Sequence, residues 1–511
     1  MQNTAVNPSV KIRPDIPRLG SMSNEPSENV SYAAAEPGYF EKRGLRRFAG
    51  VWSLWALGVG AVISGDFFGW NFGLLAGGFG GLLVATAIVA VMYVGLCYSI
   101  AELSPALPHT GGAYSFGRTA FGPWGGFITG LAESIEYVLT PAVIVVGIAG
   151  YMGTIAEASF GVVIPAPVWW AVFYALFVGI NISGVELTFR LTVAITILAL
   201  AVLVVFWIGA IPHFRWEHAL DIAPKEGGSL WFPNGLSGIA ASLPFAIWFY
   251  LAIEQLPLAA EESHDPKRDM PRALLWGIAT LIVASVLTLF LNAGIAPGAA
   301  KVGASEEPLF LAFRTIFGDG VGTTVLSLAA VVGLVASFHA IIYAYGRNIY
   351  SLSRAGYFPR WMSITHPTRK TPHVALIVGA VAGYAVALAI EYGEAWFGGV
   401  PVGGVLLNMA VFGAVIAYVM QMAAYWRIKS MTQLTRPYLS PLGRTGAAVA
   451  GGIAALTLIF LFINPDYRPG VYGVAGWFSL SLVYFGVYAR HRIILSPEEK
   501  FAMAARRSQV S

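Results

Sequence analysis

The sequence predicts an all-α protein that crosses a membrane many times. Of its 511 residues, 57% are hydrophobic and only 11% are charged, and the mean hydropathy is +0.67. An ordinary soluble domain is roughly a quarter charged, so this chain has too few charges to cover a water-exposed surface. Long apolar segments recur along the whole chain. The surplus apolar surface is therefore expected to face lipid.

Twelve segments are long and apolar enough to cross a bilayer, whose hydrocarbon core needs about 20 residues of helix. They lie near residues 51–74, 81–103, 124–152, 164–184, 190–211, 235–260, 273–296, 321–347, 373–392, 402–426, 446–464 and 470–489. Residues 1–45 are polar and rich in Pro, Ser and Asn, which predicts a disordered tail rather than a cleavable leader. Residues 491–511 form a second polar tail. The membrane domain is therefore predicted over residues 46–490.

The basic residues are distributed unevenly between the two sides of the predicted bundle. An even number of spans places both chain ends on one side. If that side is the cytoplasm, 26 of the 31 Lys and Arg residues face it, and the other five are Arg215, Lys225, Lys301, Arg314 and Arg468. Cytoplasmic loops carry such an excess, so we expect a multi-pass protein of the cell (inner or plasma) membrane with cytoplasmic termini. The basic residues form no cluster on one face, which argues against nucleic-acid binding.

Two of the twelve spans contain residues that interrupt helices. The first includes residues 58–71 (GVGAVISGDFFGWN), with four glycines and the ionisable Asp66. The sixth includes residues 242–257 (SLPFAIWFYLAIEQLP), with a proline near each end. Backbone groups freed at membrane depth must be buried in protein or line a wet cavity. Glycines also permit close helix packing, but packing does not require a carboxylate, so we predict that helices 1 and 6 are discontinuous.

Four motifs resemble those of one transporter family. They are residues 60–65 (GAVISG), 101–118 (AELSPALPHTGGAYSFGR), 260–272 (AEESHDPKRDMPR) and 353–359 (SRAGYFP). In this order they resemble the amino acid–polyamine–organocation (APC) superfamily over about residues 45–490. Residues 62–74 (VISGDFFGWNFGL) are similar to its ethanolamine permease branch. The chain is thus identified as a member of this superfamily.

The resemblance implies a fold and a mode of action. The fold is the five-plus-five inverted repeat of the LeuT/APC type, with repeats at about 48–212 and 235–427 and helices 11 and 12 at about 446–489. Substrate is held between helices 1 and 6, and substrate and proton move together. Many relatives carry a lysine deep in helix 5, where this chain has Ala199. That departure shifts the expected coupling role to carboxylates.

The residues at the first break favour a cationic substrate. In amino-acid carriers of this fold, backbone N–H groups at the break receive the substrate carboxylate, and here they belong to the stretch Ile63, Ser64 and Gly65. Asp66 beside them would repel an anionic group in a low-dielectric cavity. An amine without a carboxylate avoids the clash and gains a counter-ion. Ethanolamine, with one ammonium and one hydroxyl, meets both conditions.

Aromatic side chains near the breaks are candidates for completing a cation site. A cation over an aromatic face gains roughly 0.5–2 kcal/mol. Trp248 aligns with the aromatic gate position of relatives, and Tyr250 follows it in the sixth span. The other aromatic residues nearby are expected to serve packing or lipid contact.

Carboxylates inside the spans are candidates for carrying the coupling proton, because burial favours the neutral form. Glu133 and Glu136 share a helical face in span 3, and Glu254 follows the break in span 6. Glu136 and Glu254 are also expected to contact substrate. Asp66 and His339 complete the candidates for proton coupling. Two alternatives remain open: Glu133 in solvent near the helix end, and His339 simply hydrogen-bonded to a neighbouring helix.

Other functions remain as alternatives. The chain is an amino-acid permease or exchanger of the same superfamily if Asp66 is protonated or points away from a carboxylate pocket. An intramembrane enzyme or sensor is more remote, because the spans hold no nucleophile–base pair or metal-ligand motif. No cofactor or metal is expected, and Cys97 acts as a small hydrophobic residue. The choice between proton and sodium coupling and the oligomeric state are not predicted.

Overall fold

The computed structural model describes residues 29–305, 307–318, 323–396, 402–431 and 434–507. Within these residues, ten helices are long and apolar enough to cross a membrane. They are α3 (Phe72–Ala106), α5 (Pro123–Phe160), α6 (Ala166–Ser183), α7 (Val185–Ala210), α10 (Pro266–Ala293), α13 (Thr323–Arg354), α14 (His373–Trp396), α15 (Val402–Ile428), α16 (Gly443–Ile463) and α17 (Arg468–Val487). Large apolar side chains such as Leu480, which is 76% exposed, cover the outside and suit lipid contact. The chain is an all-α, multi-pass membrane protein.

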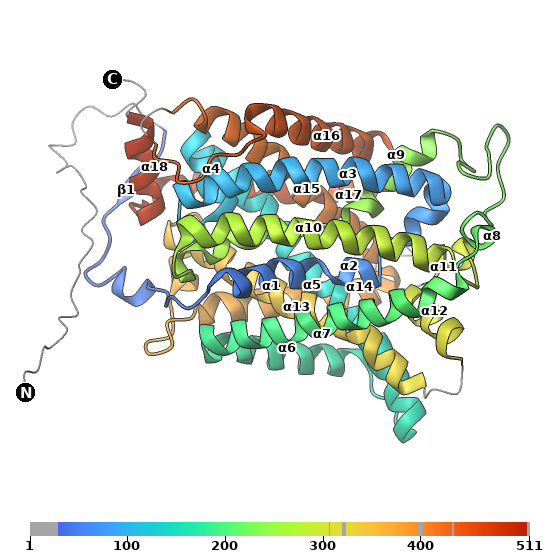
Figure 1. Cartoon of the computed structure of the whole chain (residues 1–511). Helices are drawn as coiled ribbons and strands as arrows, with labels where there is room; N and C mark the ends of the chain where they lie inside the picture. Colours follow the sequence, from blue (N-terminus) through green and yellow to red (C-terminus); the bar gives the residue numbers. More distant parts are fainter. Residues whose placement is uncertain (1–28, 306, 319–322, 397–401, 432–433, 508–511) are drawn as a thin grey trace, which may run out of the picture.

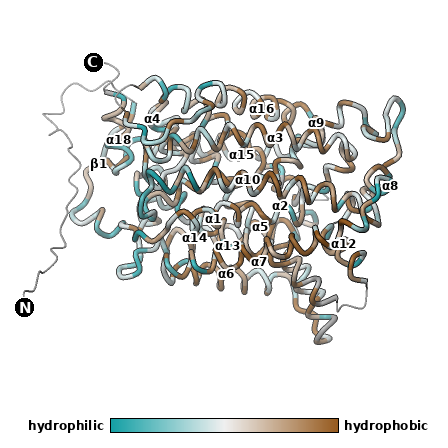
Figure 2. The backbone as a smooth tube through the Cα atoms, in the orientation of Figure 1, coloured by the Kyte–Doolittle hydropathy of each residue, from teal (hydrophilic) through white to brown (hydrophobic). Residues whose placement is uncertain are grey.

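The helices run side by side as one bundle, and the two ends of the described chain, residues 29–49 and 489–507, lie at the same end of it (Figure 1). Apolar residues fill the middle of the bundle, and hydrophilic residues gather toward its ends (Figure 2). We call this end the terminal face; it is built by residues 29–49, 107–122, 258–265, 354–372 and 489–507.

The first and sixth predicted spans are divided, as their glycines and prolines predicted. The first consists of α1 (Val51–Val62) and α2 (Ser64–Phe67), and the sixth of α9 (Ser237–Ile247) and the 3-10 helix η3 (Ile253–Glu262). These two segments are shorter than the ten long helices and lie where the first and sixth spans were predicted. The count of twelve crossings and the inverted repeat stay predictions.

Shorter elements connect the spans. They are η1 (Glu41–Arg43), α4 (Gly112–Phe121), η2 (Ile211–His213), α8 (Trp216–Ala219), α11 (Ala299–Gly303), α12 (Pro308–Phe317), η4 (Arg360–Ser363), η5 (Pro465–Tyr467) and η6 (Ala489–His491).

Helix α3 begins nine residues before the predicted start at 81 and bends at Gly78, where φ is 72°. Close packing of small residues joins α3 to α9, since a Cβ on Gly77 would collide with the carbonyl of Gly238.

The prediction of a disordered tail over residues 1–45 is wrong for its last part. Residues 29–45 pack against the bundle, while residues 1–28 lie outside the described residues. The Tyr39 hydroxyl donates to the carbonyl of Arg354 at 3.0 Å, and Arg43 Nε donates to the Ser363 hydroxyl at 2.7 Å. These contacts join positions more than 300 residues apart, so composition alone does not reveal them.

The C-terminal segment is also folded over most of its length. Strand β2 (Ile493–Ile494) pairs in parallel with β1 (Tyr32–Ala33), and helix α18 (Pro497–Arg507) follows it. Figure 1 shows α18 lying beside α4 at the terminal face. Residues 29–45 and 489–507 therefore build part of this face.

Candidate functional site

The break in the first span has its freed backbone groups bonded by a neighbouring helix. The Ser64 N–H donates to the Ser337 hydroxyl of α13 at 2.9 Å, and that hydroxyl donates to the Gly60 carbonyl at 2.9 Å. The Ile63 N–H donates back to the Val59 carbonyl at 2.9 Å. Two of the N–H groups expected to face an anion therefore have partners already.

The break in the sixth span covers residues 248–252. Helix α9 contains Pro244 and ends at Ile247, and η3 begins at Ile253 and contains Pro257. Ala252 between them has φ 84°, a left-handed conformation that costs a residue with a side chain about 1 kcal/mol or more. A strained, non-helical backbone inside a span is tolerated only where surrounding protein holds it.

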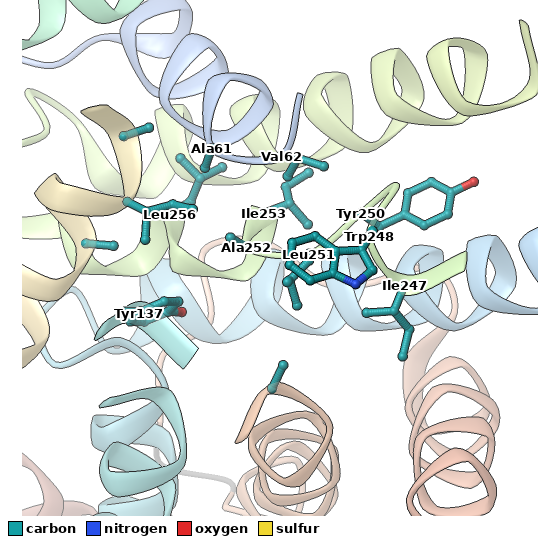
Figure 3. Packing of buried hydrophobic residues seen from close by; sticks show 14 of the residues in the cluster. Ala61, Val62, Tyr137, Ile247, Trp248, Tyr250, Leu251, Ala252, Ile253 and Leu256 are labelled. Carbon is teal, nitrogen blue, oxygen red and sulfur yellow. The ribbon is translucent and has the colours of Figure 1, made fainter. Parts of the chain in front are cut away.

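The two breaks are in direct contact. A Cβ on Gly65 would collide with the carbonyl oxygen of Trp248, so only glycine permits this approach of two backbones. A Cβ on Gly69 would lie 3.3 Å from the Trp248 indole, which covers this stretch. Figure 3 shows Trp248 and Tyr250 leaving the same bend in different directions. The interrupted segments thus form one compact site.

Asp66 is fully buried on α2, and neither of its carboxylate oxygens has a hydrogen-bond partner. Its side chain faces α10, within interaction range of the Thr288 hydroxyl. Thr288 Oγ1 accepts a hydrogen bond from Trp207 Nε1 of α7 at 3.2 Å. We expected Asp66 beside the backbone N–H groups of the break. The short helix α2 also brings it within reach of the side chains of α10.

Helix α10 presents a polar face to this site, and the sequence analysis missed it. Asn292 lies one helical turn, about 6 Å, beyond Thr288 on the same face. It is fully buried, and both polar atoms of its side chain lack a partner. Ser285, one turn before Thr288, holds the Tyr250 hydroxyl at 2.7 Å. The spacing i, i+3, i+7 of polar residues in an apolar span is the signal that predicts such a face.

Glu136 and Glu254 form a second acidic group. Both are buried, none of their carboxylate oxygens has a hydrogen-bond partner of good geometry, and the two carboxyl groups face each other within interaction range. Tyr418 lies beside Glu254, and its hydroxyl is 2.8 Å from that of Tyr93. Two facing carboxyl groups in a low-dielectric interior need a shared proton or a bound cation.

Tyrosine rings connect the two acidic groups. The ring of Tyr250 lies 5.3 Å from that of Tyr93, and the Tyr93 ring lies 5.4 Å from that of Tyr418. Asp66 lies within electrostatic range of Tyr250. The sequence-predicted residues Asp66, Tyr250 and Glu254 are therefore parts of one buried network.

Glu133 and His339 lie outside this unpartnered set. Glu133 is 1% exposed, which excludes the solvated alternative in this conformation, and it accepts hydrogen bonds from Tyr137 and Asn348 at 3.3 and 3.4 Å. The His339 ring bonds the Asn181 side chain of α6 and the Thr188 carbonyl of α7, each at 3.3 Å. The hydrogen-bonded interpretation of His339 therefore has direct support.

The central site is acidic and has no basic partner in the described ranges: neither lysine nor arginine pairs with Asp66, Glu136 or Glu254. In the same ranges, His, Cys, Asp and Glu side chains form no group of three that could hold a metal ion. The oxygens of these three acids are closed to solvent. The arrangement can bind a small cation or protons between the breaks, screened from both ends of the bundle.

Comparison with known proteins gives consistent matches. The family model described as "Amino acid permease" matches residues 54–503. An uncharacterized transporter of Rhizobium meliloti is 30% identical over 356 residues, which are 68% of this chain and 74% of the relative. The branched-chain amino acid permease BcaP of Bacillus subtilis is 24% identical over 476 residues, 88% of this chain and 94% of the relative. A methylthioribose transporter of Bacillus subtilis is 25% identical over 367 residues, 67% of this chain and 76% of the relative.

Proposed function

The chain belongs to the amino acid permease family of membrane transporters, and from this premise we propose that it imports ethanolamine or a similar small amine together with protons. The proposal includes twelve spans, a five-plus-five inverted repeat and both termini in the cytoplasm. Alternating access would move the two divided helices relative to the rest of the bundle.

The observation that carries the proposal is the buried Asp66 without a partner. An isolated buried carboxylate is costly, and an ammonium group offsets that cost. Asn292, one turn from the Thr288 contact, offers both a donor and an acceptor to a hydroxyl group. Ethanolamine carries an ammonium and a hydroxyl two carbons apart, which suits these two neighbours. A substrate carboxylate would find the Ser64 N–H already bonded.

Aromatic groups support recognition of the ammonium. The Trp248 indole is 4% exposed and lies against Gly69, three residues beyond Asp66. Such a face attracts a cation, and burial strengthens the attraction. Tyr250 contributes through its bond to Ser285 and its proximity to Asp66.

The coupling proton is assigned to the facing carboxyl groups of Glu136 and Glu254. Neither carboxyl group has a hydrogen-bond partner of good geometry, whereas Glu133 and His339 each have two hydrogen-bond partners. A shared proton keeps the pair neutral while the site is closed. Opening the site to water would let that proton leave.

Import of an amino acid is the second candidate. The match to the amino acid permease family and the similarity to the branched-chain amino acid permease of Bacillus subtilis favour it. In that case a protonated Asp66 would face α10 while the substrate carboxylate displaced Ser337 from the Ser64 N–H.

The test is uptake of radiolabelled ethanolamine into proteoliposomes that are alkaline inside. Unlabelled choline, alanine and lysine serve as competitors. We expect accumulation that an uncoupler abolishes and that alanine does not inhibit. Uptake of alanine or lysine without uptake of ethanolamine would overturn the amine assignment in favour of the second candidate.

A further inference from the structure

The C-terminal helix α18 inserts two acidic side chains into the terminal face. Glu498 is 2% exposed and Glu499 is fully buried, although both belong to a polar segment near the end of the chain. Buried acids need partners, and here the partners come from parts of the chain more than 100 residues away.

Glu499 is held by an arginine and three tyrosines. Arg118 Nε of α4 lies 2.6 Å from its carboxylate, and both side chains are fully buried. The hydroxyl groups that also donate to it belong to Tyr114 at 2.8 Å, Tyr357 at 2.9 Å and Tyr32 at 3.2 Å. One carboxylate thus joins α4, the chain after α13 and the N-terminal segment.

Glu498 is held by Arg354 at the end of α13. Arg354 Nη1 also donates to Glu261 at 2.9 Å, so one guanidinium joins α18 to the end of η3. The Arg354 guanidinium thus supplies the counter-charge for Glu261 as well as for Glu498.

Helix α4 lies over the end of the sixth span that reaches the terminal face. The Thr110 N–H donates to Glu261 at 3.2 Å, and a Cβ on Gly112 would lie 3.1 Å from the Leu258 side chain. The N–H groups of Phe48 and Ala49, just before α1, donate to the Glu262 carbonyl at 2.7 and 2.9 Å. The ends of both divided spans at the terminal face are therefore joined to each other, and α4 covers the end of η3.

The seating of α18 depends on charge more than on apolar area. Ala502 is 1% exposed, and the Phe501 ring lies 5.5 Å from that of His109, while the helix has only eleven residues. Buried ion pairs add little net stability, but removing one partner is costly. Because the complete ion pairs add little net stability, α18 can leave the terminal face and return to it as a whole helix.

We propose that α18 is a strap that holds the terminal face closed. Its residues Glu499 and Glu498 keep α4 and α13 together over the C-terminal end of η3. Release of α18 lets α4 move away and opens the central site toward the side of the termini. This inference rests on transport by alternating access but not on the identity of the substrate.

The experiment measures how fast a water-soluble maleimide labels single cysteines. The natural Cys97 is replaced by Ser, and the full chain carries either Leu256→Cys in η3 or Leu74→Cys near the opposite end; both positions are fully buried. Glu499→Gln removes the charge pair with Arg118. Ala502→Asp dislodges α18 without altering any ion-paired residue. Lys500→Gln, on the exposed side of α18, is the matched control.

Loss of several charge-assisted hydrogen bonds predicts labelling of Leu256→Cys about 10-fold faster or more in both strap variants. Labelling of Leu74→Cys should stay unchanged or fall, because opening one side closes the other. Lys500→Gln should behave like the parent. Unchanged labelling of Leu256→Cys in both variants overturns the strap, and equal acceleration at both reporters shows general loosening and overturns it too. A failure of ethanolamine uptake would leave these rates unaffected.

Discussion

Buried acidic side chains occupy two regions of the molecule and have opposite surroundings. At the terminal face Glu262, Glu498 and Glu499 each pair with an arginine, as in the 2.9 Å contact between Glu262 and Arg347. Around the helix breaks, no carboxylate oxygen of Asp66, Glu136 or Glu254 has a hydrogen-bond partner of good geometry, and no arginine or lysine among the described residues pairs with them. Residue type and burial are the same in both regions, and only the pairing differs.

This difference separates structural acids from binding acids. A paired buried acid loses a strong contact when it is neutralised and leaves its partner as an uncompensated charge. An unpaired buried acid is a cost to the folded state that only a proton or a cation removes. We therefore expect substitutions in the two regions to affect different quantities.

The largest effect is expected at the terminal face. Glu262→Gln leaves the buried Arg347 guanidinium without its counter-charge and should lower the free energy of unfolding by about 3–5 kcal/mol. Equilibrium unfolding of the purified full chain measures it. The matched control is Glu186→Gln, because Glu186 pairs with Arg190 at 2.6 Å on the exposed surface. That exposed pair should contribute less than about 1 kcal/mol, and equal losses in the two variants would contradict the distinction.

A Glu→Gln substitution near the breaks should change the coupling of transport to protons rather than the stability of the fold. Glu136→Gln removes half of the facing carboxyl pair, so stability should stay within about 1 kcal/mol of the parent or rise. A pH gradient should no longer drive accumulation, which would otherwise gain about 1.4 kcal/mol for each pH unit. Uptake with and without an imposed gradient measures this. Destabilisation comparable to that of Glu262→Gln would show that Glu136 is a structural acid after all.

The indole at the sixth break should contribute a smaller amount. Trp248→Leu removes the aromatic face and should weaken ethanolamine binding by roughly 0.5–2 kcal/mol, while Trp248→Phe should lose less. Trp170→Phe, a buried tryptophan of α6, is the control. Binding isotherms for the three variants check the order. An affinity loss in Trp170→Phe as large as that in Trp248→Leu would remove the case for a cation over Trp248.

The amide on α10 should set the preference for a hydroxyl group. Asn292→Leu should reduce the preference for ethanolamine over ethylamine by about 5- to 10-fold, because one hydrogen bond contributes roughly 1 kcal/mol. Ethylamine itself should bind much as before. Thr280→Val is the control, since Thr280 lies on the same helix and bonds Trp55. If the preference survives in Asn292→Leu, the hydroxyl is recognised elsewhere.

Much of the membrane bundle could be predicted from the sequence, because apolar length and Gly or Pro interruption are local properties. The divided spans around Asp66 and Glu254 follow directly from such signals. The pairing of Glu499 with Arg118 could not be predicted, since the two residues are 381 positions apart and Glu499 lies in a segment with the composition of a tail. Burial there results from the tertiary fold.

The candidate site could be predicted in part. Asp66, Glu136 and Glu254 stand out because carboxylates inside apolar spans are rare, and Trp248 stands out because the family resemblance places it at the aromatic gate. The direction of Asp66 toward α10 depends on the geometry of the four-residue helix α2, which sequence patterns do not specify. Asn292 was missed because a lone amide in a span equally suits packing between helices.

The most direct test of the central claim is the binding of ethanolamine to the purified full chain and to Asp66→Asn, with alanine as the competing ligand. If Asp66 is the ammonium counter-ion, ethanolamine should raise the melting temperature of the parent and not of Asp66→Asn. Removing one buried charge–charge contact should cost about 100-fold in affinity. Alanine should have no effect on either protein. Stabilisation by alanine that persists in Asp66→Asn, with none by ethanolamine, would contradict the claim.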